Sequence, residues 1–212
     1  MERVYANRTE AGRLLGAAVR ERLGKQPAVV LGLPRGGVPV AVGVAEALGT
    51  TVDVLVVRKV GVPSQPELAM GAVAPGGVTI RNAEVLGLVP DAARRFESVA
   101  AGEREEVSRR ERLFRGQRAP LDLKGRTVVL VDDGVATGAT LRAAVAAARK
   151  LGATRVVVAV PVASREAIAR LSVEADEVIC LEQPAFFMAV GQFYEDFPQV
   201  SDAEVRTLLA EG

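Results

Sequence analysis

The chain has 212 residues, a formal net charge of +1 and no histidine. This charge balance gives no argument for a nucleic-acid or membrane-surface partner, and the missing histidine excludes Ser-His-Asp triads and histidine-ligated zinc sites. The single cysteine, Cys180, has no partner for a disulfide within the chain and is expected in a buried strand. Because we find no signal-peptide core and no apolar run of the ~18 residues that a membrane span needs, we expect a cytoplasmic protein.

Short apolar runs alternate with amphipathic segments along the chain, which is typical of a parallel sheet covered by helices. Strands are expected at residues 28–31, 52–57, 127–131, 155–160 and 177–181. Helices are expected at residues 38–48, 91–116, 138–151 and 164–171. Asn7-Arg8-Thr9-Glu10 and Ser201-Asp202-Ala203-Glu204 have the pattern of capping boxes and are expected to open a first and a last helix.

This order predicts an α/β fold with a doubly wound, mainly parallel five-stranded sheet in the order 2-1-3-4-5 and helices on both faces. Residues 61–77 are rich in Pro, Gly and Ser, and we expect an exposed, mobile loop there, with a small hairpin around Pro75-Gly76-Gly77. We expect a single domain, residues 1–212. Its parts would be a core at about 28–59 and 126–181, an insertion at about 60–120, and a hood at about 182–200 with N-terminal contributions.

The most informative stretch is residues 128–140, Val-Val-Leu-Val-Asp-Asp-Gly-Val-Ala-Thr-Gly-Ala-Thr. Four apolar residues run into Asp132 and Asp133, which places two acids at the carboxyl end of a strand, where open α/β sheets bind ligands. The loop after them lacks bulk, so its backbone N–H groups can approach a phosphate, and the following helix points its positive end there. Carboxylates beside such a loop suit a phosphorylated sugar.

This stretch closely resembles the phosphoribosyl pyrophosphate (PRPP) motif of type I phosphoribosyltransferases: a hydrophobic strand, two acids, a short spacer and Thr-Gly-x-Thr. The resemblance implies that Asp132 and Asp133 contact the ribose hydroxyls. It also implies that the 5′-phosphate is bound by Gly134, Val135, Ala136, Thr137, Gly138, Ala139 and Thr140. The alternative is a tight strand-to-helix turn with an acidic helix start.

A second strand-end loop, Pro34-Arg35-Gly36-Gly37, enters a helix and adds a cation. Strand order 2-1-3-4-5 puts the two loops together at the switch point, where they could bind two anionic groups. By resemblance this is the pyrophosphate loop, and the cis peptide that the family often has would be Pro34–Arg35. Arg58 and Lys59 resemble the basic residues before the family's flexible catalytic loop, with residues 64–71 as part of a lid. Alternatively, Arg35 is an exposed turn residue and Arg58-Lys59 a solvated charge pair.

Aromatic residues concentrate at residues 186–197, after the last expected strand. The segment loosely resembles the C-terminal part of hypoxanthine-guanine phosphoribosyltransferases, which implies that Phe187 or Met188 covers the acceptor and that Glu195 faces Mg²⁺. The alternative is a small hydrophobic cap on the core. The chain departs from that subgroup at Ala136, where the purine enzymes carry an Asp that touches the base. This departure puts 6-oxopurine salvage in doubt.

The resemblance implies a Mg²⁺-dependent transferase of nucleotide metabolism, which moves the 5-phosphoribosyl group from PRPP to a nitrogen acceptor (a base or an amine) and releases pyrophosphate. Asp132, Asp133, Arg58 and Lys59 would be the catalytic residues. Mg²⁺ would bind mainly through substrate oxygens, with Asp132, Asp133 and Glu195 as candidate protein ligands.

A PRPP-sensing regulator that acts on RNA or on a protein partner is the rival hypothesis. Its one hint is the Arg-rich helix at residues 91–116, which is also explained as a solvated helix with ion pairs such as Glu106–Arg110. PRPP synthetase shares the loop motif, but that enzyme is longer and has a second domain of the same kind. The sequence does not name the acceptor and leaves a homodimer open.

Overall fold

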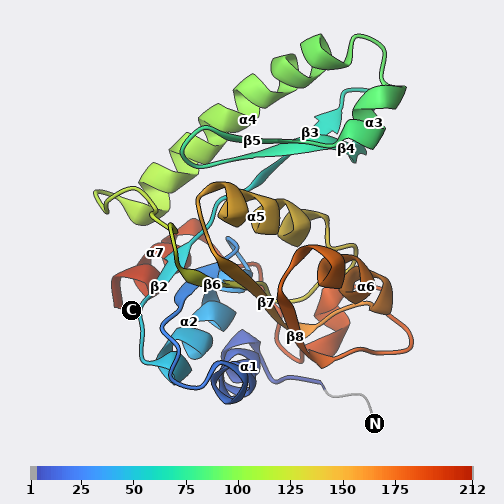
Figure 1. The fold of residues 1–212 in the computed structure, drawn as a ribbon. Coiled ribbons are helices and arrows are strands. Elements are labelled where there is room, and N and C mark those ends of the chain that lie inside the picture. The colour runs from blue at the N-terminus through green and yellow to red at the C-terminus, as the bar shows by residue number, and fades with distance from the viewer. Residues whose placement is uncertain (1–3, 212) are drawn as a thin grey trace.

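A computed structural model describes residues 4–211. Five parallel strands form the central sheet in the order β2-β1-β6-β7-β8 (Figure 1), which confirms the predicted doubly wound α/β fold. The strands are β1 (Val29–Gly32), β2 (Val52–Val54), β6 (Thr127–Val131), β7 (Arg155–Val162) and β8 (Glu177–Glu182). The second strand is therefore shorter than expected. Cys180 lies in β8 and is half-buried.

Helices cover both faces of this sheet, as Figure 1 shows. The side chains of β6 show why, because successive residues of this strand point to opposite faces of the sheet and pack in two separate cores. Val129 and Val131 pack with the first group of helices, and Val128 and Leu130 pack with the second. The first group comprises α1 (Arg8–Leu23), α2 (Gly37–Leu48) and α7 (Asp202–Glu211), and the second comprises α5 (Ala139–Lys150) and α6 (Arg165–Glu174).

The expected N-terminal caps are present on the first and last helices. The Asn7 side chain accepts a hydrogen bond from the Glu10 backbone N–H at 3.0 Å, and the Ser201 hydroxyl accepts one from the Glu204 N–H at 3.1 Å. Each cap satisfies a backbone donor that has no partner within its helix. No helix within residues 4–211 combines the length and apolar character needed to cross a bilayer.

The expectation of a loop at residues 61–77 is wrong. The segment contributes to an antiparallel sheet of β3 (Arg58–Val62), β4 (Gln65–Ala74) and β5 (Val78–Arg81), and only the hairpin at Pro75-Gly76-Gly77 is as expected. The lid expected at residues 64–71 is likewise mostly strand. Gly71 serves close packing here, since a Cβ at this position would lie 2.0 Å from the Ile80 carbonyl oxygen of the neighbouring strand.

This sheet, α3 (Ala83–Leu88) and α4 (Ala92–Arg115) form a layer that we call the arm, residues 58–116. Figure 1 shows the arm lying over α5, with α4 running along the sheet as its longest helix. The buried side chains of Phe96 and Val107 on α4 belong to the same core as Met70 and Val73 on β4. The helix predicted at residues 91–116 is therefore confirmed, and its apolar side holds the arm together.

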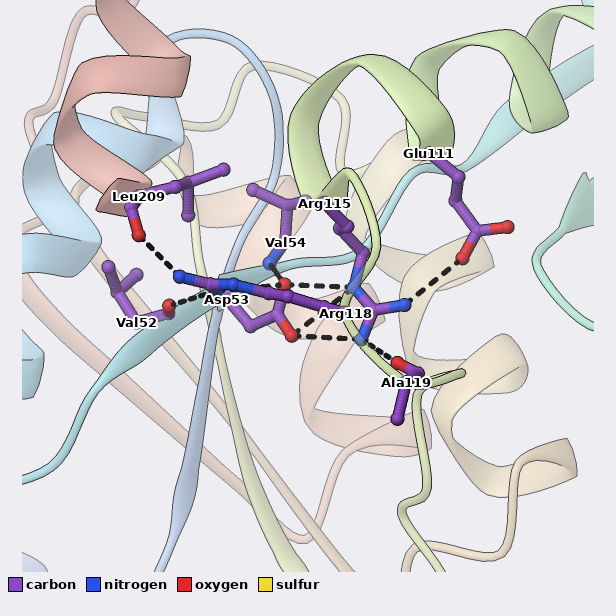
Figure 2. A network of polar contacts seen from close by, with 8 residues as sticks. All are labelled: Val52, Asp53, Val54, Glu111, Arg115, Arg118, Ala119 and Leu209. Carbon is purple, nitrogen blue, oxygen red and sulfur yellow. Dashed lines mark hydrogen bonds and ion pairs between the residues drawn. The ribbon is translucent and has the colours of Figure 1, made fainter.

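Asp53 on β2 anchors the end of the arm to the core (Figure 2). Arg115 donates from Nε and Nη2 to both carboxylate oxygens of Asp53 at 3.0–3.2 Å. Arg118 lies 3.8 Å from the same carboxylate and donates to the carbonyl oxygens of Val52 and Leu209. These contacts tie α4, α7 and β2 to one another, close to the segment that leads into Arg58.

Candidate functional site

The two loops expected to bind anions leave the same edge of the sheet. β1 and β6 are parallel neighbours, with Gly32 opposite Val131, so the segments that follow them start side by side. A Cβ on Gly36 would lie 2.0 Å from Oδ2 of Asp133, and one on Gly37 would lie 2.5 Å from the Val131 carbonyl oxygen. Only glycine lets the loops approach this closely, so the structure brings the predicted pyrophosphate loop onto the predicted ribose-binding acids.

The Pro34–Arg35 peptide bond is cis, as the resemblance led us to expect. Arg35 is partly exposed, and its Nη1 lies 3.6 Å from Oδ1 of Asp202 at the start of α7. The cation of this loop therefore has a carboxylate partner on α7.

The expected phosphate loop is a turn between β6 and α5. Ala136, Thr137, Ala139 and Thr140 are exposed, whereas Val135 is buried and its backbone pairs with the strand end at Ala163. The Ser164 hydroxyl donates to the Ala136 carbonyl oxygen at 2.6 Å. The loop thus presents small and hydroxyl side chains at the N-terminus of α5, as a phosphate site requires.

Burial dominates the electrostatics of the two acids. It raises the pKa of Asp132 well above its usual value, and the neighbouring charge of Asp133 adds to the shift. Burial also raises the pKa of Asp133, which a hydrogen bond from Arg8 lowers in part. Asp132 in turn accepts the Asp133 backbone N–H at 3.0 Å. Carboxylates that are desolvated side by side mark a site suited to a ligand or a cation.

Arg8 is a residue of the site that the sequence analysis did not identify. Its Nε donates to Oδ2 of Asp133 at 2.8 Å, and its Nη1 donates to the Pro198 carbonyl oxygen at 2.8 Å. Its guanidinium lies over the Phe197 ring, 3.7 Å from the centroid. One local signal points to it: Arg8 is the first residue of α1, where a cation opposes the helix dipole, so another partner must hold it there.

Tyr194 is a second residue that we did not identify from the sequence. Its hydroxyl donates to the Asp133 backbone carbonyl oxygen at 2.6 Å, and burial raises the pKa of that hydroxyl. Its backbone pairs with Tyr5, whose carbonyl oxygen accepts the Glu195 N–H at 2.8 Å. The N-terminal segment and the hood thus form one unit that closes on Asp133.

Arg58 and Lys59, which we expected just before a flexible loop, instead begin strand β3. They line a cavity of about 480 Å³ together with Pro34 and Thr140, so the structure does bring them to both loops. Arg58 is held by Glu103 on α4, with 2.7 Å between Nε and Oε2.

The hood residues point in different directions. Phe187 packs on Phe193 with 5.3 Å between ring centroids, whereas Met188 is 90% exposed and the side chain of Glu195 lies at the surface. Val190 reaches the PRPP motif, since a Cβ on Gly134 would lie 2.5 Å from its Cγ1. The hood therefore lies directly over the motif, and Met188 is the more accessible of the two predicted acceptor-covering residues.

Residues 4–211 contain no group of three or more His, Cys, Asp or Glu side chains placed to hold a metal ion. Glu195 therefore does not form a three-carboxylate cluster with Asp132 and Asp133. The two aspartates alone offer hard oxygen donors of the kind that Mg²⁺ binds when substrate and water supply its other ligands.

The Arg-rich helix α4 carries many of the ion pairs expected of a solvated helix. Glu106 accepts from Arg109 and Arg110 at 2.7 and 2.6 Å, and these two contacts lower its pKa to about 2. Arg115 lies 3.5 Å from Glu111. Glu106 therefore pairs with the arginines three and four residues after it.

Known proteins are similar to this chain in sequence and in fold. The family model described as "Phosphoribosyl transferase domain" matches residues 2–198. Two Mycobacterium tuberculosis proteins, from strains CDC 1551 / Oshkosh and ATCC 25618 / H37Rv, are both named "Putative phosphoribosyl transferase" and are 49% identical over 208 residues. The match covers 98% of this chain and 46% of theirs, so the chain spans about half their length.

The crystal structure of the protein TT1426 from Thermus thermophilus is 47% identical to this chain and matches it with a TM-score of 0.89 over 98% of both chains. A family model that spans nearly the whole chain and relatives at this identity identify the family. The chain belongs to the phosphoribosyl transferase domain family.

Proposed function

We propose that this protein is a Mg²⁺-dependent phosphoribosyltransferase, which moves the 5-phosphoribosyl group from PRPP to a nitrogen acceptor with release of pyrophosphate. The observation that carries the proposal is the close approach of Gly36 to Asp133. It joins two loops suited to anions at a pair of acids suited to ribose hydroxyls. PRPP has this order of groups: a phosphate, a ribose and a pyrophosphate.

The residues then have distinct roles. Asp132 and Asp133 orient the ribose by accepting hydrogen bonds from its hydroxyls, and residues 134–140 hold the 5′-phosphate. Residues 34–37 receive the pyrophosphate, while Arg58 and Lys59 offset the charge that develops on it as it leaves. Bound Mg²⁺ would supply further charge neutralisation on pyrophosphate oxygens, with Asp132, Asp133 and Glu195 as candidate protein ligands.

The acceptor is a base or an amine that enters beneath the hood, where Met188 or Phe187 would cover it. Ala136 occupies the position from which an acid reads the base in the purine enzymes. We therefore expect little transfer to 6-oxopurines. The Ala136→Asp variant restores that single contact and should not by itself create robust hypoxanthine transfer.

Calorimetry with PRPP, with and without Mg²⁺, tests the binding step. A panel of bases and amines screened for PRPP-dependent pyrophosphate release tests the transfer. Absence of both binding heat and thermal shift at millimolar PRPP would refute the proposal.

The PRPP-sensing regulator remains the second candidate, since it would have the same ligand site without turnover. Its basic-face argument is weakened by the structure, because the arginines at 104, 109, 110, 115 and 118 all have carboxylate partners. PRPP binding without pyrophosphate release across the whole panel would favour the sensor.

A further inference from the structure

The carboxylate of Asp133 is held unevenly. In the described part of the chain, hydrogen bonds from other residues reach Oδ2 but not Oδ1. The residue lines a cavity of about 500 Å³ whose walls also include Arg8, Arg35, Gly36 and Val190. One oxygen of this acid is therefore fixed by a neighbouring side chain, and the other has no donor from another described residue. The cavity that Asp133 lines lies between the loop at residues 34–37 and the hood.

The partner that fixes Oδ2 is itself rigidly placed. Arg8 is only 9% exposed. The carbonyl oxygen of Pro198, the ring of Phe197 and the carboxylate of Asp133 contact it from three directions. A guanidinium fixed at several points loses little freedom when it bonds a carboxylate, so it can set the orientation of that carboxylate.

We propose that Arg8 is a positioning residue of the phosphoribosyl site, which holds Oδ2 of Asp133 so that Oδ1 is presented to a ribose hydroxyl. The inference rests on the proposed function, because it assigns the ribose of PRPP to Asp133. It adds a residue from the N-terminal helix to a site that is otherwise built from the ends of β1 and β6, the arm and the hood.

The positive charge of Arg8 should also favour PRPP binding. Asp132 and Asp133 lie where a polyanionic substrate must approach, and like charges at short range oppose binding. Arg8 offsets one of the two negative charges without occupying the free oxygen. Arg35 lines the same cavity but is directed to Asp202, with 3.6 Å between the charged atoms.

The hood contacts both members of the Arg8–Asp133 pair. Arg8 bonds the hood at Pro198, and Tyr194 bonds the Asp133 backbone, so the hood and the acid share two links. If Arg8 acts by orienting Asp133 in the ground state and the transition state alike, its loss should raise KM for PRPP more than it lowers kcat.

The test measures PRPP affinity by calorimetry, with Mg²⁺ present, for the Arg8→Gln variant and a matched control. Arg13→Gln is the control, because Arg13 lies on the same helix and is exposed. We expect about tenfold weaker PRPP binding for Arg8→Gln, the size of a lost charge-assisted contact, and wild-type affinity for Arg13→Gln. Arg8→Lys keeps the charge but not the two-directional donor fork and should fall between them.

A double-mutant cycle with Asp133→Asn distinguishes positioning from general support of the fold. If Arg8 acts through Asp133, then Arg8→Gln should weaken PRPP binding little further in the Asp133→Asn background. Additive losses, or tighter binding by Arg8→Gln, would overturn the inference. Should Arg8→Gln fail to fold, the same cycle is run with Arg8→Lys and judged by the same criterion. Wild-type protein that does not bind PRPP refutes the proposed function, whereas equal affinities of the wild type and both Arg8 variants refute only the role of Arg8.

Discussion

Two aspartates in this protein bind a buried arginine, and they differ in what remains free. Asp53 gives both oxygens to Arg115, accepts the Val54 backbone N–H at 2.8 Å, and lies beside Arg118 (Figure 2). Asp133 gives one oxygen to Arg8, receives no hydrogen bond from another described residue on the second, and lines a cavity. The first acid has no bonding capacity left for a ligand, and the second does.

This difference in hydrogen bonding distinguishes an ion pair that stabilises the fold from an acid that can bind a ligand. A buried charge costs free energy unless it is fully paired, so a satisfied acid such as Asp53 is suited to fixing one element against another. An acid that keeps a free oxygen retains part of that cost, and a ligand can relieve it. Incomplete satisfaction at a strand end therefore points to function more strongly than burial or an ion pair does.

The largest expected effect comes from breaking the satisfied pair. Asp53→Ala leaves Arg115 buried without its carboxylate, and loss of one partner of a buried pair costs about 3–5 kcal/mol of unfolding free energy. In a chain of this size, that lowers Tm by roughly 2–4 °C for each kcal/mol. Thermal and urea unfolding measure it, with the exposed Asp122→Ala as control. By the same scaling, a Tm within about 2 °C of wild type would contradict the structural role of Asp53.

Substitutions of Asp132 and Asp133 should affect ligand binding more than stability, in contrast to Asp53→Ala. Asp132→Asn and Asp133→Asn each remove a charge that would bond a ribose hydroxyl, which should weaken PRPP binding by about 1.5–3 kcal/mol, or roughly tenfold to a hundredfold. The stability of Asp132→Asn should stay level or rise, because two desolvated carboxylates become one. Asp133→Asn also leaves the buried Arg8 without its carboxylate and should therefore lose stability. Calorimetry and thermal unfolding on the same samples test both signs. Wild-type PRPP affinity in both variants would mean that the pair is structural.

The same pair predicts a pH dependence of stability in metal-free buffer. Burial raises the pKa of Asp132, so the folded chain holds a proton at pH values where the unfolded chain has released it. The free-energy contribution of this group to stability is therefore least favourable at neutral pH and improves as pH falls towards about 4. Urea unfolding at several pH values should show this slope in the wild type and a weaker one in Asp132→Asn. Identical slopes would contradict it.

The contact between the loops can be broken without touching a charge. Gly36→Ala puts a Cβ 2.0 Å from Oδ2 of Asp133, so the acid or the loop must move. We expect a stability loss of about 1–3 kcal/mol, typical of overpacking, and weaker PRPP binding. Gly102→Ala in α4 is the control, since nothing lies within 4 Å of its added Cβ, and it should stabilise by about 0.5–1 kcal/mol. Unchanged PRPP affinity in Gly36→Ala would sink the idea that loop contact builds the site.

The smallest effect is expected on the solvent side of α4. Glu106→Gln removes the partner of Arg109 and Arg110 but should cost no more than ~1 kcal/mol, because water and salt screen surface pairs. The pKa of Glu106 is lowered to about 2, so its contribution is present above pH 4.5 and is lost as pH falls through about 2. Unfolding of Glu106→Gln beside the exposed Glu105→Gln checks this. A loss of unfolding free energy as large as that of Asp53→Ala would mean that the surface pairs of Glu106 stabilise the fold as much as the buried Asp53–Arg115 pair does.

The sequence alone determined the parallel sheet, the helix caps and the two strand-end loops, and the general topology of doubly wound folds supplied the strand order. These features are written in local patterns: strands buried on both faces, capping residues, and acids or glycines at the point where a strand ends. The relation of Asp132 and Asp133 to residues 34–37 also followed, since parallel neighbours end at the same edge of the sheet.

Only the tertiary structure decided the arm, the partners of the charges and the role of Arg8. Glycines and prolines at residues 61–77 indicate a loop when they are considered alone, yet Gly71 allows strands to pack closely and the prolines lie at or near tight turns. Arg8 meets Asp133 across 125 positions of sequence, and Arg58 meets Glu103 across 45. No local pattern carries such pairings, because they depend on which elements the folded core places side by side.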